Sequence, residues 1–396
     1  MKILVVLSRL PYPLDKGDKL RAFYQIKELS KNNEVYLFCL NGSPIHTKAK
    51  EILSAFTKDI YIAEFNKIDG LIGIATSFFD GTPFQTGYYS HSKNIKAFKD
   101  YCKKIKPDVI FNQFVRTAKY TCDNTPKVLD FQDALSANME GRASKSKFIE
   151  KFLFTLEAKR LRKYEAKMFD IFDKLTIIVD ADKKEIRHPR QEEIIVLPNG
   201  VDNSYFDYNT PQKKEFDIIF SGGMSYAPNI VAANYLGKEI MPLVWDKLPN
   251  AKLVIAGANP SSSVKNLANE NITVTGWVDD MKEYYAKSKI FIAPMQIGTG
   301  LQNKLLEAMA MNLPCITSTL ANEALGATPN ENILIANTPQ ENANQIISLL
   351  TNKEKANSIA ERGNQFVKQN YRWETYGNLL ENILKEATIL KEVTKK

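Results

Sequence analysis

The sequence is poor in the residues that build disulfide and metal sites. Its 396 residues include four cysteines and three histidines. The cysteines lack the paired spacing of a zinc site, and two of them, Cys39 and Cys315, lie in apolar runs that are typical of buried strands. We therefore expect reduced thiols, no metal site and no cofactor.

Long apolar runs are also lacking. No segment approaches the ~20 uninterrupted apolar residues that a membrane-spanning helix needs, and the first run, Met1–Leu7, is too short for the core of a signal peptide. We therefore expect a cytoplasmic protein. A peripheral position on the inner face of the cell membrane stays open, because the net charge of +8 favours anionic partners without choosing among them.

Two motifs that would indicate other functions are missing. No Gly-x-Gly-x-x-Gly follows the first apolar run, which weakens an oxidoreductase interpretation. Basic and aromatic residues are not interleaved as in nucleic-acid-binding proteins, so no nucleic-acid partner is expected.

Short apolar runs alternate with helical segments along the chain, which predicts an α/β protein with parallel sheets. The length suits two domains rather than one core. A polar segment with a proline, Thr210–Lys214, marks the expected boundary. We predict a first domain at 1–210, a second at 211–370 and a final helix in 371–396.

The stretch from Gly298 to Met311 has the strongest pattern of a binding site. An apolar run precedes it, two glycines follow, and the residues from Leu301 onward are helix formers. The first turn of such a helix has unpaired N–H groups and a partial positive charge, so it suits a phosphate. Lys304 could meet the anion, and Glu307, on the same helix face, could accept hydrogen bonds from two hydroxyls. Alternatively, the glycines form a simple turn and the two charges are a solvated pair.

This stretch resembles the nucleotide-sugar motif of the retaining glycosyltransferases of family 4. The matching pattern is Gly298-x-Gly300-x-x-x-Lys304-x-Leu306-Glu307. The resemblance implies the GT-B fold: two Rossmann-like domains that face each other across a cleft, with a carboxyl-terminal helix that crosses back to the first. It also implies that Glu307 binds the donor ribose. Thr299 replaces the first glutamate of the family motif.

The tripeptide Gln302-Asn303-Lys304 resembles the corresponding sequence in sugar transferases of exosortase and exopolysaccharide loci, which are the nearest match. In the family, a second turn also binds the diphosphate, and Gly222-Gly223 resembles it. Met224 and Asn229 stand where many relatives have an arginine and a lysine, so we assign more of the phosphate charge to Lys304.

Three further positions resemble donor contacts of the family. Gly17 is similar to a glycine that approaches the donor phosphate from the first domain, although a surface turn is an equal alternative. Trp277 and Val278 match the segment whose backbone contacts the nucleotide base. Trp277 could equally be a packing residue.

Asp133 is the candidate at the acceptor. The apolar run Lys127–Leu129 leads directly into Gln132 and Asp133, and ligands of open α/β sheets bind at the carboxyl ends of strands. Asp133 resembles the acidic member of a family pair near the acceptor, in which Gln132 replaces a histidine. Alternatively, Asp133 caps the following helix.

A basic segment, Gly141–Phe169, predicts one long helix. Its apolar members, Phe148, Phe152, Leu156 and Leu161, could form a single stripe, and a basic amphipathic helix can lie on an anionic membrane. The alternative is a helix that packs on the sheet with a solvated charged face.

The resemblance implies a metal-independent retaining transferase of the hexosyltransferase type. It would move a sugar from a UDP- or GDP-sugar to a glycan or lipid-linked acceptor in cell-surface or exopolysaccharide synthesis. Predicted catalytic residues are Asp133, Lys304 and Glu307. Predicted donor-binding residues are Gly17, Gly222, Gly223, Asn229, Trp277, Val278, Gly298, Thr299, Gly300, Leu301, Gln302 and Asn303. The alternatives are a noncatalytic sugar-nucleotide or glycan-binding protein and a sugar-nucleotide epimerase of the same fold.

Overall fold

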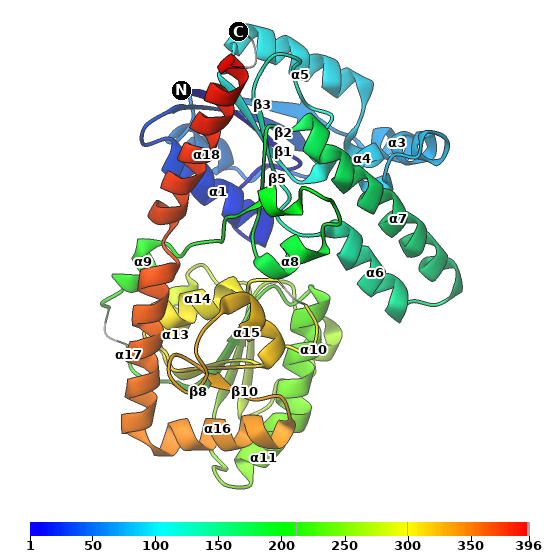
Figure 1. Ribbon diagram of the computed structural model, residues 1–396. Helices are drawn as coiled ribbons and strands as arrows, with labels where there is room; N and C mark the ends of the chain where they lie inside the picture. The colour runs from blue at the N-terminus through cyan, green and yellow to red at the C-terminus, as the bar shows by residue number, and fades with distance from the viewer. Residues whose placement is uncertain (211, 299, 394–396) are drawn as a thin grey trace. The chain divides into compact units, whose positions relative to one another are not determined.

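The computed structural model describes residues 1–210, 212–298 and 300–393, and the chain forms two compact units (Figure 1). The first unit contains Met1–Pro198 and the carboxyl-terminal segment that begins at Glu374. The second unit contains Asn199–Trp373. Thr299, one of the predicted donor contacts, lies outside the described residues.

The first unit is built on a seven-stranded parallel sheet with the order β3-β2-β1-β4-β5-β6-β7. Its strands are β1 (Lys2–Leu7), β2 (Glu34–Asn41), β3 (Asp59–Glu64), β4 (Val109–Gln113), β5 (Lys127–Asp130), β6 (Lys174–Ile177) and β7 (Ile195–Val196). Val5 of β1 pairs with Leu37 on one side and Phe111 on the other, and all three are buried. Strands covered on both faces need such continuous apolar runs, which is why the sequence predicts them.

Helices cover this sheet. They are α1 (Gly17–Leu29), α2 (Ala49–Ser54), α3 (Lys67–Asp80), α4 (Phe84–Tyr89), α5 (Ser92–Ile105), α6 (Leu135–Lys145), α7 (Phe148–Ile171), α8 (Asp180–Glu185) and α18 (Trp373–Val393). The final helix, α18, lies along α1 in Figure 1, and its Leu380 and Leu384 share a core with Ile3 of β1. A Cβ on Gly377 would lie 2.4 Å from Cβ of Glu28 in α1, so the two helices are in close contact. The predicted return of the last helix to the first domain is confirmed.

The prediction of one helix over Gly141–Phe169 is wrong. The helix is interrupted between α6 and α7, and Phe148, the first residue of α7, has a φ of 39°. The predicted apolar stripe is wrong too, because Leu161 is buried while Phe148 is 90% exposed and Phe152 is 67% exposed. The segment from β3 to β4 also contains three helices, α3 to α5, that the sequence analysis did not predict.

The second unit has a six-stranded parallel sheet with the order β10-β9-β8-β11-β12-β13. Its strands are β8 (Phe216–Ser221), β9 (Leu253–Ala256), β10 (Ile272–Gly276), β11 (Ser288–Ala293), β12 (Cys315–Thr317) and β13 (Leu334–Ile335). Its α-helices are α9 (Asn203–Phe206), α10 (Ala227–Tyr235), α11 (Met241–Trp245), α12 (Ser262–Lys265), α13 (Met281–Ala286), α14 (Asn303–Ala310), α15 (Thr319–Leu325), α16 (Pro339–Thr351) and α17 (Lys353–Asn370). In the described part of the chain, no helix is both long and apolar enough to cross a bilayer.

Candidate functional site

The loop between β11 and α14 has the form expected of an anion site. Gly298 has a φ of +96°, a conformation that favours glycine. The helix begins at Asn303 rather than at Leu301, and Gln302 occupies its N-cap without a side-chain capping bond. Instead, Nε2 of Gln302 donates to the carbonyl of Gly300 (2.8 Å). Among the described residues, the first turn of α14 therefore has no side-chain cap, and an anion can fill that role.

Lys304 lies in this first turn and is half-buried. Its Nζ donates to Oδ1 of Asn229, lies 3.9 Å from Sδ of Met295, and is 4.6 Å from the ring centroid of Phe220. Burial lowers the pKa of Lys304 from 10.5 to about 7, and the charge of Glu307 partly opposes this shift. Within the described residues no carboxylate forms an ion pair with this ammonium. An anionic ligand would therefore supply the negative charge that the buried ammonium lacks.

The turn after β8 holds the partner of Lys304. Gly222 has a φ of +143°, and a Cβ there would lie 2.7 Å from Nδ2 of Asn229 and 3.3 Å from Nζ of Lys304. Only glycine allows these side chains to approach the backbone so closely. Asn229 also donates through Nδ2 to the carbonyl of Gly223 (3.0 Å), so it holds the turn and the ammonium together. Met224, the residue after Gly223, is fully buried in the core.

Glu307 is one turn further along α14 and is also half-buried. The hydroxyl of Tyr285 donates to its Oε2 (3.1 Å) and lies 2.8 Å from Oγ of Ser221. Burial raises the pKa of Glu307 from 4.5 to about 7, while the hydrogen bonds of Tyr285 and Tyr205 act in the opposite direction. Glu307 and Lys304 thus have other partners and are not a solvated surface pair.

A hollow of about 690 Å³ lies at the carboxyl ends of β9 and β10. Its lining includes Asn259, Lys265, Gly276 and Trp277. Trp277 is 59% exposed, and its Nε1 donates to Asp279 (3.2 Å), so it is not a packing residue. Val278 follows it and is half-buried. The hollow offers an aromatic face to a planar ligand.

The remaining predicted donor contacts have simple local roles. Oδ1 of Asn303 accepts a hydrogen bond from Nδ2 of Asn199 (3.1 Å), a residue of the same unit. Leu301 is half-buried. Around Gly223 and Gly300, a Cβ would meet open space, so both backbones can be approached by a ligand.

In the first unit, Asp133 follows β5 and is half-buried. It does not cap α6: the N-cap is Ala134, and the N–H of Ser136 donates to Glu165 (3.0 Å). Burial raises the pKa of Asp133 to about 6, and the Arg21 guanidinium opposes this shift. Its carboxyl group has no hydrogen bond or ion pair with the side chains of the described ranges, which leaves it free to accept a proton.

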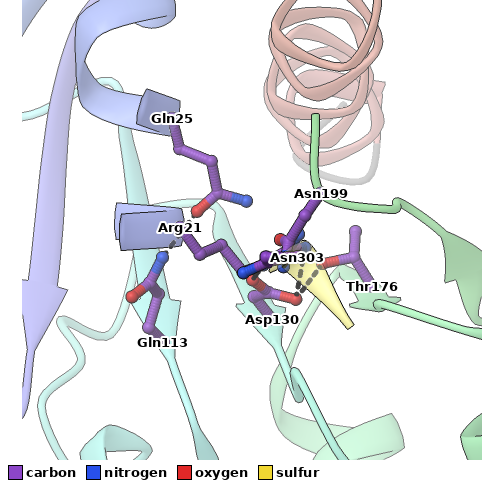
Figure 2. A network of polar contacts seen from close by, with 7 residues as sticks. All are labelled: Arg21, Gln25, Gln113, Asp130, Thr176, Asn199 and Asn303. Carbon is purple, nitrogen blue, oxygen red and sulfur yellow. Dashed lines mark hydrogen bonds and ion pairs between the residues drawn. The ribbon is translucent and has the colours of Figure 1, made fainter. Parts of the chain in front are cut away.

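A buried ion pair links α1 to the carboxyl end of β5, three residues before Asp133 in the sequence (Figure 2). Arg21 and Asp130 are both 0% exposed, and Nε of Arg21 lies 2.6 Å from Oδ2 of Asp130. Nη2 of Arg21 donates to Oδ1 of Asp130 (3.1 Å), and the Thr176 hydroxyl donates to the same oxygen (3.0 Å). Such a bidentate, fully bonded pair gives a rigid support, because breaking it would leave a buried charge.

Arg116 is a further candidate site residue that the sequence analysis did not name. It follows β4, its guanidinium carbon lies 4.3 Å from the ring centroid of Phe114, and its Nε has no hydrogen-bond partner among the residues that the structure describes. Burial lowers the pKa of Arg116, and its positive charge lowers the pKa of Asp133. Its place after a parallel strand is the same signal that singled out Asp133. Gly17 is exposed at the start of α1, next to Asp18, which pairs with Arg9 (3.1 Å).

The geometry of the second unit agrees with a comparison of the sequence with known families. Residues 215–352 match the family described as "Glycosyl transferases group 1". This segment includes the Gly222 turn, the hollow at Trp277 and the whole of α14, with Lys304 and Glu307.

Two relatives extend the similarity. The chain is 23% identical over 386 residues to an uncharacterized 44.6 kDa protein in the cps region of Klebsiella pneumoniae, covering 93% of this chain and 96% of that protein. It is 28% identical over 218 residues to a GDP-mannose-dependent monoacylated alpha-(1-6)-phosphatidylinositol monomannoside mannosyltransferase of Corynebacterium glutamicum. That match covers 50% of this chain and 56% of the relative.

Similar solved structures span both units. Anabaena Alr3699/HepE in complex with UDP has a TM-score of 0.69 and 14% identity, covering 98% of this chain and all (100%) of that one. Sucrose-phosphate synthase of Thermosynechococcus elongatus has a TM-score of 0.68 and 14% identity, covering 98% and 99%. The two parallel sheets and the returning helix α18 confirm the predicted GT-B fold.

Proposed function

We propose that this protein is a retaining glycosyltransferase that moves a sugar from a nucleotide diphosphate donor to a glycan or lipid-linked acceptor. The observation that carries the proposal is the Lys304 ammonium, which is half-buried at an uncapped helix start, bonded to an amide and lacking a carboxylate partner within the described residues. A phosphate is the ligand that such a position accommodates best.

The donor diphosphate would lie between the first turn of α14 and the Gly222-Gly223 turn. Lys304 would offset the negative charge that grows on the departing diphosphate, and the sugar would be replaced on the face that the diphosphate leaves. Asn229 would hold the ammonium in place. Glu307 would accept hydrogen bonds from the ribose hydroxyls, and the hollow beside Trp277 would receive the base.

The acceptor would bind at the carboxyl ends of the strands in the first unit. Asp133 would orient the attacking hydroxyl or receive its proton, and its pKa of about 6 leaves it ionised at neutral pH. Arg116, whose Nε has no partner within the described part of the chain, would contact a polar or anionic group of the acceptor. The chemistry proposed here uses no metal.

Cell-surface or exopolysaccharide synthesis is the proposed context. It is supported by the relative from a cps region and by the resemblance of the tripeptide Gln302-Asn303-Lys304 to transferases of exopolysaccharide loci. The donor would be a UDP- or GDP-sugar: a similar solved structure contains UDP, and another relative is GDP-mannose-dependent.

A screen of UDP-, GDP- and ADP-sugars tests the proposal. One of the donors is expected to raise the melting temperature, and the same donor should then yield a glycosylated product with extracted glycans or lipid-linked saccharides. Donor binding without any product would favour the noncatalytic alternative. An altered free sugar nucleotide, formed without an acceptor, would indicate an epimerase.

Donor affinity is expected to peak near pH 7. Below that pH, protonation of Glu307 (pKa about 7) removes its charge-assisted hydrogen bonds, and above it Lys304 (pKa about 7) loses its positive charge. Each limb approaches a tenfold loss of affinity per pH unit. Calorimetric titration of the donor from pH 5 to pH 9 measures this profile.

Two variants assign the limbs of this profile. Lys304→Arg should remove the alkaline limb, since guanidinium does not titrate in this range, and Glu307→Gln should remove the acid limb. A flat profile for the unmodified protein would contradict these assignments.

A further inference from the structure

Helix α3 exposes most of its large apolar side chains, whereas its two buried residues are the small Gly70 and Ser77, the reverse of an ordinary surface helix. Its exposed members are Ile68 (67%), Leu71 (63%), Ile72 (53%), Phe78 (53%) and Phe79 (93%). Ile68, Leu71, Ile72 and Phe79 follow helical spacing, so they form a stripe on the outer face.

The buried side of α3 explains this orientation. A Cβ on Gly73 would lie 2.1 Å from the carbonyl oxygen of Gly87 in α4, and a Cβ on Gly70 would lie 2.3 Å from the ring of Tyr88. A Cβ on Gly87 would in turn lie 1.8 Å from Oγ of Ser77. Larger residues cannot replace these glycines at such separations, so rotating α3 to bury its isoleucines would break the contact with α4.

The start of α7 exposes a second apolar group. Phe148 is 90% exposed, Ile149 is 76%, Phe152 is 67% and Leu153 is 39%. Both groups belong to the first unit, and Figure 1 shows α3 and α7 on the same side of its sheet.

Arg160 connects the two helices. Its Nη1 donates to the carbonyl of Ser77 (2.7 Å), and its guanidinium lies 5.8 Å from the ring of Phe78. Phe152 is eight residues before Arg160, roughly 12 Å along the helix. Arg160 is thus a structural residue whose guanidinium holds α7 against α3 and is not free to contact lipid.

We propose that these two groups form a membrane-docking surface that inserts into the headgroup region of an anionic bilayer. It consists of Ile68, Leu71, Ile72 and Phe79 of α3 with Phe148, Ile149 and Phe152 of α7. Clusters of exposed large apolar side chains mark interaction sites. Aromatic and aliphatic side chains beside lysines are typical of helices that lie at the lipid interface.

Charge complementarity favours lipid over a protein partner. Lys147 and Lys151 are exposed beside Phe148 and Phe152, with Glu150 between them. On α3, the exposed Lys67 offsets the charge of Asp69, and Asp80 has hydrogen bonds from Thr82 and the nearby charges of Lys119 and Arg160, which together lower its pKa. The apolar side chains therefore have a net basic rim, which anionic headgroups complement.

Co-sedimentation with vesicles of equal parts phosphatidylglycerol and phosphatidylcholine tests this surface, and it needs no donor or acceptor. The full chain is expected to pellet with the vesicles, and part of the binding should persist in 1 M salt, because insertion of apolar groups is not screened. The pairs Leu71→Glu with Phe79→Glu and Phe148→Glu with Phe152→Glu should each reduce binding at least tenfold.

The matched control is Ile389→Glu on α18, which changes an apolar side chain of the same unit that is 59% exposed. It should bind vesicles as the unmodified protein does. All of these positions are on the surface, so the melting temperature should be unchanged. No binding, binding abolished by salt, or equal loss in the Ile389 control would overturn the proposal. A dimer that the Leu71 and Phe148 pairs dissociate would do so as well, since it would identify a second copy as the occupant.

Discussion

Lys304→Ala is expected to lower the rate of sugar transfer by about 10²- to 10³-fold, the usual cost of removing one group that stabilises transition-state charge. The diphosphate gains negative charge as the sugar departs, so the loss should be larger in kcat than in donor affinity. Helix N–H groups supply only partial charges, and Met224 of the neighbouring turn is buried and carries no charge. Steady-state kinetics with the donor found by screening measures the effect.

A second lysine of the same unit provides the control. Lys289 on β11 is 52% exposed and pairs with Asp217 (2.8 Å), so Lys289→Ala should leave turnover unchanged. Lys304→Arg should recover part of the rate, because the charge is kept while its position shifts. EDTA should not inhibit the unmodified enzyme. If Lys304→Ala has normal turnover, another residue must supply the positive charge that offsets the diphosphate. Lys16 would then be the next residue to test.

Glu307→Gln is expected to weaken donor binding about 10- to 100-fold, which corresponds to the loss of charge-assisted hydrogen bonds worth about 1.5–3 kcal/mol. The amide keeps the shape of the side chain and can still accept from Tyr285, so the fold should be retained. Calorimetric titration of the donor measures the affinity, and thermal unfolding checks the fold.

Glu323→Gln, at an exposed position of α15 in the same unit, is the matched control and should bind the donor normally. If Glu307→Gln also binds the donor normally, then Glu307 serves only to hold Tyr285. Tyr285→Phe would separate these roles, since it removes the hydrogen bond to Glu307 but leaves the carboxylate available to the ribose.

Sequence alone determined the two parallel sheets. Strands buried on both faces must be continuously apolar, so runs such as Lys2–Leu7 and Ile290–Pro294 stand out locally. Their strand spans differ from the prediction by only a few residues, for example Ser288–Ala293 for β11. The glycine turn before α14 was also predictable, because positive φ selects glycine.

The tertiary structure alone decided which side chains meet. Asn229 and Lys304 are 75 residues apart, and their contact depends on how β8 and β11 pair, which no local pattern contains. The same holds for Glu307 and Tyr285, and for Glu165, which accepts from the N–H of Ser136 in the first turn of α6, where the sequence offered Asp133 as the cap.

The orientation of α3 was likewise beyond the sequence. Its apolar residues would ordinarily be assigned to a core, but the steric fit of Gly73 against Gly87 turns them outward. Hydrophobic periodicity identifies an apolar face but cannot say whether it is buried. In this helix, close backbone contact between small residues, a property of two helices together, decided the outcome.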